Sequence, residues 1–130
     1  MLTFLDSHCE VTEGWLQPLL HRIAEDPSNV VCPVINAINA DTFRYQFRSP
    51  SRGVTTVGGF NWNLIFTWHP VPAAKRPLDP TSPVLTPTMA GGLFSINKRF
   101  FYQLGGYDPG FDIWGEWSLW ILTLLIISFS

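Results

Sequence analysis

The hydrophobic residues of this chain form short runs that are interrupted by polar, glycine-rich or proline-rich segments. The first run, Leu2-Thr3-Phe4-Leu5, ends abruptly in Asp6-Ser7-His8. A run of this length is typical of a β-strand in a sheet core. The polar triplet is then expected at the carboxyl end of that strand, at the edge where open α/β sheets bind ligands.

The next two segments predict a helix followed by a second strand. Residues 14–26 carry apolar side chains at near-helical spacing, with Pro18 close to the start, where proline is tolerated. Residues 30–35 read Val-Val-Cys-Pro-Val-Ile, a buried-strand pattern in which Pro33 favours an edge or an irregularity. Strand, helix and strand in this order make a βαβ unit, which predicts a parallel sheet.

The middle of the chain alternates aromatic and polar residues. This alternation predicts half-exposed strands over residues 41–47 and 61–69, because side chains two positions apart share one face of a strand. In the second strand the shared face consists of Trp62, Leu64, Phe66 and Trp68. The polar, glycine-containing residues 49–59 predict a loop or hairpin between them.

A proline-rich segment begins the last third of the chain. Residues 70–87 hold six prolines, which predicts a surface loop, either a lid beside a site or a plain connector. The pair Gly91-Gly92 then precedes an apolar strand that ends at Ile96, and Asn97 is expected to start a helix. Adjacent glycines allow a sugar or a backbone to approach closely, or simply make a tight bend.

The last segment, residues 117–130, contains no charged side chain. It has 14 residues, fewer than the roughly 20 apolar residues that a membrane span needs. A buried element, an interfacial segment and a tail unrelated to the rest of the chain are the alternatives. We favour the unrelated tail.

Length and composition indicate a single globular domain. The chain has 130 residues, of which 46% are hydrophobic and 15% aromatic, the opposite of a disordered composition. Its net charge of −2 and the lack of a basic run argue against a general nucleic-acid binder. Cys9 and Cys32 form neither a disulfide framework nor a zinc motif, and their redox state stays open.

Asp6 and His8 are the candidate metal ligands. On an extended backbone, two residues at this spacing point to the same side. A carboxylate oxygen and an imidazole nitrogen that face one point suit a divalent ion such as Mn²⁺, which in turn suits a nucleotide diphosphate. The alternative is a strand whose polar end residues only hydrogen-bond the next turn.

The ordered set of segments resembles one known family. In order, the chain carries LTFLDSHCE, GWLQPLL, VVCPVI, an F-x-W-x-L-x-F-x-W stripe, TPTMAGGLFSINK and LGGYDPGFDIWG. Over residues 2–115 this set resembles the catalytic domain of the polypeptide N-acetylgalactosaminyltransferases. The resemblance implies a metal-dependent, retaining enzyme that moves GalNAc from UDP-GalNAc to Ser or Thr hydroxyls of polypeptides. The implied fold is α/β, a partial GT-A (Rossmann-like) mixed sheet flanked by helices and incomplete at both ends.

The resemblance also implies roles for individual residues. Asp6 and His8 would hold Mn²⁺ against the diphosphate, with Ser7 beside the nucleotide. The other residues implied to bind the donor are Ala90, Gly91, Gly92 and Trp114. Phe66 and Trp68 are implied to line the acceptor-peptide groove, where aromatic faces hold an extended peptide. Ordinary sheet packing is the alternative for these two aromatic residues.

The chain departs from the family pattern after Trp114. The family continues as Trp-Gly-Gly-Glu-Asn, whereas this chain reads Trp114-Gly115-Glu116-Trp117. Glu116 is the candidate catalytic carboxylate, but it comes one position early, and such a shift on a strand turns a side chain to the opposite face. The family's third metal ligand, a downstream histidine, has no counterpart.

We therefore expect a partial catalytic domain over residues 1–116 and an apolar tail over residues 117–130. The family's upstream nucleotide-binding half, membrane anchor and lectin domain are expected to be missing, so the isolated chain should transfer little or no GalNAc. The alternatives are a non-catalytic module that binds peptides or a partner, and a truncated gene product. A location in the Golgi is implied by the resemblance alone.

Overall fold

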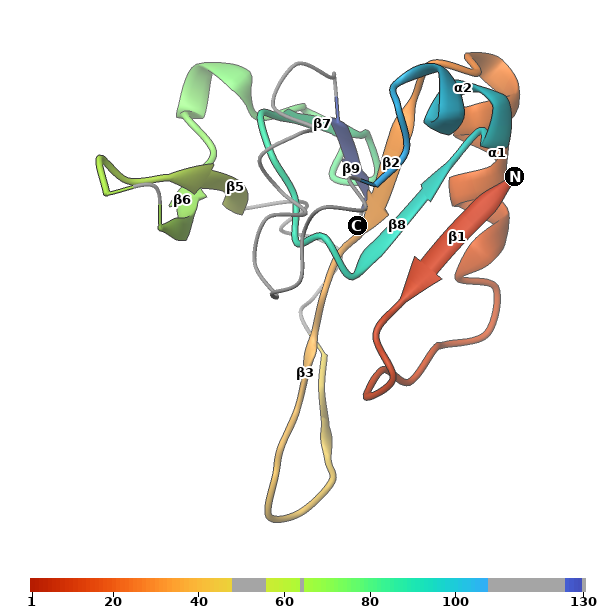
Figure 1. Ribbon diagram of the computed structural model, residues 1–130. Helices are drawn as coiled ribbons and strands as arrows, with labels where there is room; N and C mark the ends of the chain where they lie inside the picture. The colour runs from red at the N-terminus through yellow and green to blue at the C-terminus, as the bar shows by residue number, and fades with distance from the viewer. Residues whose placement is uncertain (48–55, 64, 108–125, 130) are drawn as a thin grey trace.

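The computed structural model describes residues 1–47, 56–63, 65–107 and 126–129 of the chain. Within them, the main sheet has five strands in the order β1-β8-β2-β9-β7 (Figure 1). These strands are β1 (Leu2–Leu5), β8 (Leu93–Ile96), β2 (Val30–Pro33), β9 (Ile126–Phe129) and β7 (Val84–Thr86).

The main sheet is mixed. Strand β8 pairs antiparallel with both β1 and β2, β2 and β9 are parallel, and β9 and β7 are antiparallel. The prediction of a mixed α/β sheet is confirmed. Strands β1 and β2 run in the same direction, but the expectation that they build a parallel sheet together is wrong, because β8 lies between them.

Helix α1 (Leu16–Glu25) covers one face of this sheet. Leu19 and Ile23 of the helix are buried against Val31 of β2. The helix ends at Asp26, whose backbone N–H donates a hydrogen bond to the carbonyl of the fourth residue before it at 3.2 Å. The helix predicted over residues 14–26 is therefore confirmed.

The opposite face of the sheet carries the larger apolar core. Neighbouring residues of a strand point to opposite faces, so Val30 faces this core while the next residue faces α1. Aromatic side chains of α2 (Lys98–Gln103) pack against it, and Asn97 caps that helix by accepting hydrogen bonds from two backbone N–H groups. The predicted helix start at Asn97 is confirmed. The buried core residues are Val30, Cys32, Met89, Phe94 and Ile96.

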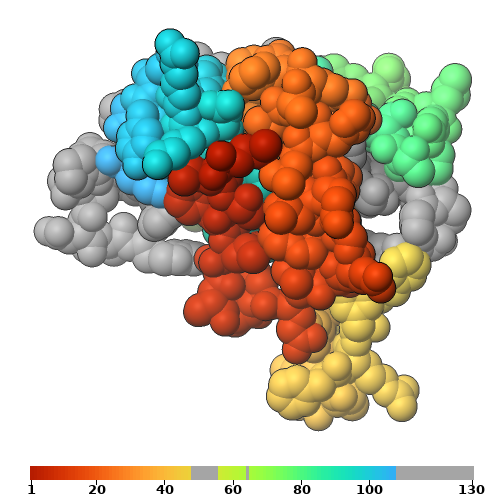
Figure 2. Space-filling model, turned by 90° about the vertical axis from the view of Figure 1, so that its right-hand side faces the viewer, coloured from red at the N-terminus to blue at the C-terminus, as the bar shows by residue number. Residues whose placement is uncertain are grey.

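A short hairpin of β3 (Ala37–Ile38) and β4 (Tyr45–Gln46) projects from the body of the molecule (Figures 1 and 2). The strand predicted over residues 41–47 is thus wrong except for two residues. The reason is a turn, in which the Asn39 side-chain oxygen accepts hydrogen bonds from the backbone N–H groups of the second and third residues after it.

A second hairpin consists of β5 (Thr56–Phe60) and β6 (Phe66–Pro70). Residues 56–59 therefore form a strand, although a loop or hairpin was predicted over 49–59. The strand predicted over 61–69 begins only at Phe66, because the Asn61 side-chain oxygen accepts hydrogen bonds from the backbone N–H groups of Asn63 and Ile65 and so makes a turn before it. Trp62 lies in this turn, fully exposed and off the predicted aromatic face, and Leu64 lies outside the described residues.

The proline-rich residues 70–87 are not a continuous loop. They include a short 3-10 helix, η2 (Ala73–Lys75), and their last part is β7 of the main sheet. Val71 and Val84 form a small buried cluster, against which Val34, just after β2, and Val57 of β5 pack. This cluster holds the β5–β6 hairpin against the main sheet, and a bridge between Gly58 and Thr88 continues the contact.

Part of the predicted apolar tail belongs to the main sheet. Residues 126–129 form β9 between β2 and β7, while the rest of residues 117–130 lie outside the described ranges. Of the helices that the described ranges contain, none has both the length and the apolar character that crossing a membrane requires.

Candidate functional site

The candidate metal ligands lie in a turn at the carboxyl end of β1. Asp6, Ser7 and His8 are all exposed. The backbone N–H of Cys9 donates a hydrogen bond to the Asp6 carbonyl oxygen at 3.3 Å, so residues 6–9 form a tight turn. The side chains of Asp6 and His8 were predicted to point to the same side because the backbone was expected to be extended. The backbone turns here instead, so that basis for the prediction is wrong. The turn still places both side chains at the predicted edge of the sheet.

The strand that leads into this turn is anchored on both faces. On one face the Phe4 ring stacks on Phe94, with ring centroids 4.6 Å apart, and it meets the Tyr107 ring edge to face, with centroids 5.3 Å apart. On the other face the hydroxyl groups of Thr3 and Ser95 are hydrogen-bonded at 2.9 Å. Burial raises the pKa of Tyr107 above its ordinary value. The rigid aromatic packing fixes where the exposed turn begins.

The glycine-containing turn before β8 lies directly beside Asp6. Residues 90–92 are partly buried, and the Leu93 N–H donates a hydrogen bond to the Ala90 carbonyl at 3.3 Å. Antiparallel pairing of β1 with β8 sets this turn opposite the end of β1. The Asp6 carboxylate occupies the space where a Cβ atom on Gly92 would stand. The structure thus brings together two segments that were each predicted to bind the donor.

The chemistry of this corner suits a divalent ion. Within the described ranges, the Asp6 carboxylate has no side-chain hydrogen bond or ion pair, and Asp6 and His8 are both accessible. Oxygen and imidazole donors of this kind suit Mn²⁺. The described residues contain no group of three or more His, Cys, Asp or Glu side chains that could hold a metal ion. Two candidate ligands are therefore present here, and no third is found beside them in that part of the chain.

The candidate acceptor residues lie on the β5–β6 hairpin. Phe66 and Trp68 share one face of β6, and their rings meet edge to face with centroids 5.2 Å apart. The Phe66 ring also meets the Phe60 ring edge to face across the hairpin, with centroids 6.1 Å apart. Phe66 is therefore part of the packing of the hairpin, whereas Trp68 keeps 53% of its surface exposed. Trp68 is the better placed of the two aromatic residues to contact a ligand.

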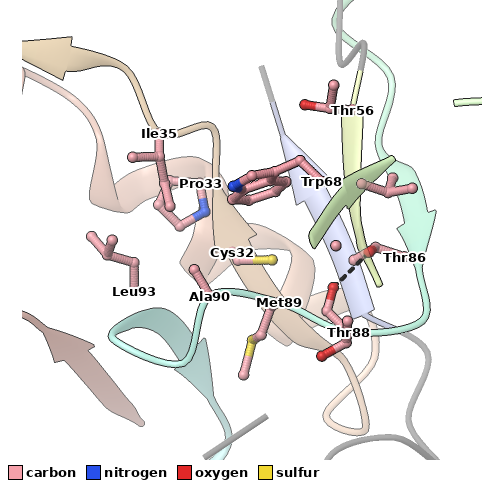
Figure 3. A pocket seen from close by; sticks show the side chains of 12 residues that line it. Cys32, Pro33, Ile35, Thr56, Trp68, Thr86, Thr88, Met89, Ala90 and Leu93 are labelled. Atoms are coloured by element: carbon pink, nitrogen blue, oxygen red, sulfur yellow. Dashed lines mark hydrogen bonds between the residues drawn. The ribbon is translucent and has the colours of Figure 1, made fainter. Parts of the chain in front are cut away.

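A small cavity joins the predicted donor and acceptor residues. It has a volume of about 20 Å³, and both Trp68 and Ala90 line it (Figure 3). This space admits about one water molecule. Cys32 of β2 and Thr88 also line the cavity, and neither was predicted to belong to the site. No local pattern marks them, because they reach the cavity only through packing of the hairpin against the sheet.

Two further predicted site residues lie outside the described ranges. These are Trp114, predicted to bind the donor, and Glu116, predicted as the out-of-register catalytic carboxylate. Their roles stay predictions. Cys9 is partly buried and Cys32 is buried, and no disulfide joins these two described residues.

Comparison with known proteins defines the class of this chain. The family model for glycosyl transferase family 2 matches residues 1–101. The chain therefore belongs to glycosyl transferase family 2.

The resemblance to polypeptide N-acetylgalactosaminyltransferases is confirmed. The chain is 59% identical over 121 residues to putative polypeptide N-acetylgalactosaminyltransferase 9 of Drosophila melanogaster, an alignment that covers 92% of this chain and 18% of the relative. It is 56% identical over 121 residues to polypeptide N-acetylgalactosaminyltransferase 5 of Caenorhabditis elegans, with 92% and 19% covered. The chain thus spans about a fifth of the length of these curated relatives, 18% and 19% respectively.

A solved structure has the same fold. The crystal structure of GalNAc-T7 with UDP, GalNAc and Mn²⁺ matches with a TM-score of 0.83 and 32% sequence identity. The match covers 98% of this chain and 25% of that chain. The predicted GT-A-type α/β fold is therefore confirmed.

Proposed function

We propose that this chain forms the metal-binding and donor-binding corner of a Mn²⁺-dependent, retaining polypeptide N-acetylgalactosaminyltransferase. The enzyme moves GalNAc from UDP-GalNAc to Ser or Thr hydroxyls of polypeptides. One observation carries the proposal: the Asp6 carboxylate lies against Gly92, next to the exposed His8, at the carboxyl end of β1. The names of the relatives, and the UDP, GalNAc and Mn²⁺ in the GalNAc-T7 structure, support the same donor and metal for this chain.

In this proposal Asp6 and His8 hold the metal. When bound, Mn²⁺ supplies Lewis-acid stabilisation of the charge that develops on the departing diphosphate. The residues themselves bind and orient. The Ala90-to-Gly92 turn offers backbone without bulky side chains to the sugar, and Trp68 offers an aromatic face to the acceptor. Placing the hydroxyl near the anomeric carbon lowers the barrier by proximity.

The proximity of the two predicted residue sets supports transfer from a donor to an acceptor. Trp68, from the predicted acceptor set, and Ala90, from the predicted donor set, line the same small space although they come from different elements. A transferase needs its donor and acceptor side by side, so this proximity is consistent with transfer. We also propose that the chain acts in the Golgi lumen, in line with the resemblance. Co-localisation of the expressed protein with a Golgi marker tests this location.

The proposal predicts weak but metal-dependent binding of UDP. Two ligands without a third among the described residues should hold Mn²⁺ loosely, so we expect little or no GalNAc transfer by the 130-residue chain. The sharper measurement is calorimetric titration of UDP into the purified chain, with and without Mn²⁺. We expect binding that requires Mn²⁺ and that is reduced about tenfold or more in Asp6→Ala.

Asp41→Ala is the matched control for this titration. Asp41 is an exposed aspartate in the projecting β3–β4 hairpin, so its loss changes the net charge equally without touching the site. We expect Asp41→Ala to bind UDP and Mn²⁺ like the wild type. The proposal is wrong if folded wild-type protein binds no UDP with Mn²⁺, or if Asp6→Ala and Asp41→Ala behave alike.

A second candidate function is a non-catalytic module that binds peptides. The exposed Trp68 side chain next to Phe66 favours it, because this aromatic surface does not need a bound metal. Titration of a Ser/Thr-containing peptide, followed by tryptophan fluorescence, separates the two candidates. Peptide binding that does not depend on Mn²⁺ or UDP, but that is lost in Trp68→Ala, favours the peptide-binding module over the enzyme.

A further inference from the structure

We infer that Gly92 is a positioning residue for the Asp6 carboxylate, and that the missing side chain at position 92 is what allows Asp6 to serve as a metal ligand. This inference rests on the proposed function, since it assigns a role to Gly92 within the proposed metal site. It concerns the space beside Asp6 rather than contacts of the glycine backbone with a donor.

The contact follows from the register of the sheet. Leu5 of β1 pairs with Leu93 of β8, so the next residues outward, Asp6 and Gly92, stand opposite each other. A Cβ atom built on Gly92 would overlap with both carboxylate oxygens of Asp6 and with the carbon that carries them. No side chain larger than hydrogen therefore fits at position 92 while the Asp6 carboxylate keeps its place.

The glycine is needed here for space and not for its backbone conformation. Among the described residues, glycines with positive φ are Gly14, Gly105 and Gly106, all of them in other turns. Gly92 has a φ that other residues adopt readily. Alanine would therefore be tolerated by the backbone at position 92, and the three atoms nearest to its methyl group would all belong to the Asp6 side chain.

Moving the carboxylate should matter because the backbone beneath it cannot follow. The stacked rings of Phe4 and Phe94 and the Thr3–Ser95 hydrogen bond hold β1 in place. A methyl group at position 92 must then turn the Asp6 side chain into another rotamer. Metal–ligand distances tolerate only about 0.2 Å, so this rotation removes the carboxylate from the ion.

The test measures Mn²⁺ affinity directly, by the electron paramagnetic resonance signal of free Mn²⁺, on the full 130-residue chain. Gly92→Ala is expected to weaken Mn²⁺ binding by about 10- to 100-fold, the usual cost of losing a residue that orients a ligand. Gly59→Ala is the matched control. Its new methyl group would lie 2.8 Å from the His69 Nε2 atom, in the β5–β6 hairpin on the other side of the molecule (Figure 1). Gly59→Ala should lower stability and leave the Mn²⁺ affinity unchanged.

A second measurement detects the contact without any metal. Gly92→Ala should lower the urea midpoint of unfolding only slightly, because the exposed Asp6 side chain can turn away, and this small loss should shrink by about half or more in an Asp6→Ala background, where the colliding carboxylate is gone. If Gly92→Ala does not fold but Asp6→Ala/Gly92→Ala does, the collision is confirmed. If neither folds, or if the loss is the same in both backgrounds, the inference is wrong.

The two proposals fail in different ways. Wild-type protein that binds Mn²⁺, together with a folded Gly92→Ala variant that binds it equally well, overturns the role of Gly92 and leaves the proposed metal site intact. Folded wild-type protein that binds no Mn²⁺ overturns the metal site and the positioning role together. A lower affinity in Gly92→Ala, with Gly59→Ala unchanged, supports both.

Discussion

Truncation of Phe94 should destabilise the protein more than any exposed truncation in the same sheet. Phe94 is 1% exposed, and its ring stacks on Phe4 with centroids 4.6 Å apart and planes 20° apart. Phe94→Ala removes the ring from a core in which Val30, Cys32 and Ile96 sit on paired strands, so the surroundings can close only part of the cavity. Such a change costs about 3–5 kcal/mol.

Urea unfolding followed by far-UV circular dichroism measures this cost. With an m-value of about 1–3 kcal/mol/M, the midpoint should fall by at least about 1 M. Leu85→Ala is the control, because Leu85 lies on β7 of the same sheet and is 60% exposed. Its truncation should change the free energy of unfolding by less than about 1 kcal/mol.

A double-mutant cycle with Phe4→Ala separates the stacking from simple burial. The coupling between Phe4 and Phe94 should be about 0.5–1.5 kcal/mol, the value of an aromatic pair beyond its buried area. Because small domains have only about 5–15 kcal/mol of stability, Phe94→Leu replaces Phe94→Ala if the latter is unfolded in water. A Phe94 variant with the same midpoint as Leu85→Ala would refute the assignment of this ring pair as the anchor of β1.

Two further predictions concern single hydrogen-bonded groups. Asn97→Ala removes the side-chain oxygen that accepts hydrogen bonds from the Arg99 and Phe100 N–H groups, and it should cost about 0.5–2 kcal/mol in urea unfolding. An equal loss in Gln103→Ala, which truncates an exposed residue of the same helix, would contradict this role. The Ser28 hydroxyl, and after it the Ser28 N–H, lower the pKa of Asp26, so Ser28→Ala should raise that pKa toward its ordinary value in an NMR titration while leaving the pKa of Asp79 unchanged. Because the folded-state pKa of Asp26 is lowered, its contribution to stability is present above the unfolded pKa and is lost as the pH falls through the folded pKa; an unchanged pKa in Ser28→Ala would contradict the assignment.

Several elements could be predicted from the sequence because their signals are local. The apolar run of β1, the helical spacing of α1 and the capping residue Asn97 each lie within a few residues of the structure that they specify. The alternation of aromatic and polar residues over 41–47 and 61–69 was a less reliable sign of strands. There Asn39 and Asn61 bind neighbouring backbone N–H groups and form turns, and such local side-chain bonds compete with strand pairing.

The sequence named candidate residues for the site but did not predict how their backbone and side chains are arranged. Asp6 and His8 were placed correctly at the end of β1, but their turn was not foreseen, because a single apolar run does not say how the chain leaves a strand. Cys32 and Thr88 were missed altogether. They line the cavity because the β5–β6 hairpin packs on the sheet, and nothing near them in the sequence encodes that packing.

By itself, the sequence determined the family, the early strand–helix–strand order and the residue types available for metal and sugar chemistry, since motifs and periodicity are properties of neighbouring residues. Only the tertiary structure decided that β8 lies between β1 and β2, and that Gly92 therefore stands against Asp6. Strand order depends on which distant segments bury each other's apolar faces. The space beside a carboxylate depends on that order, so it could be seen only once the chain was folded.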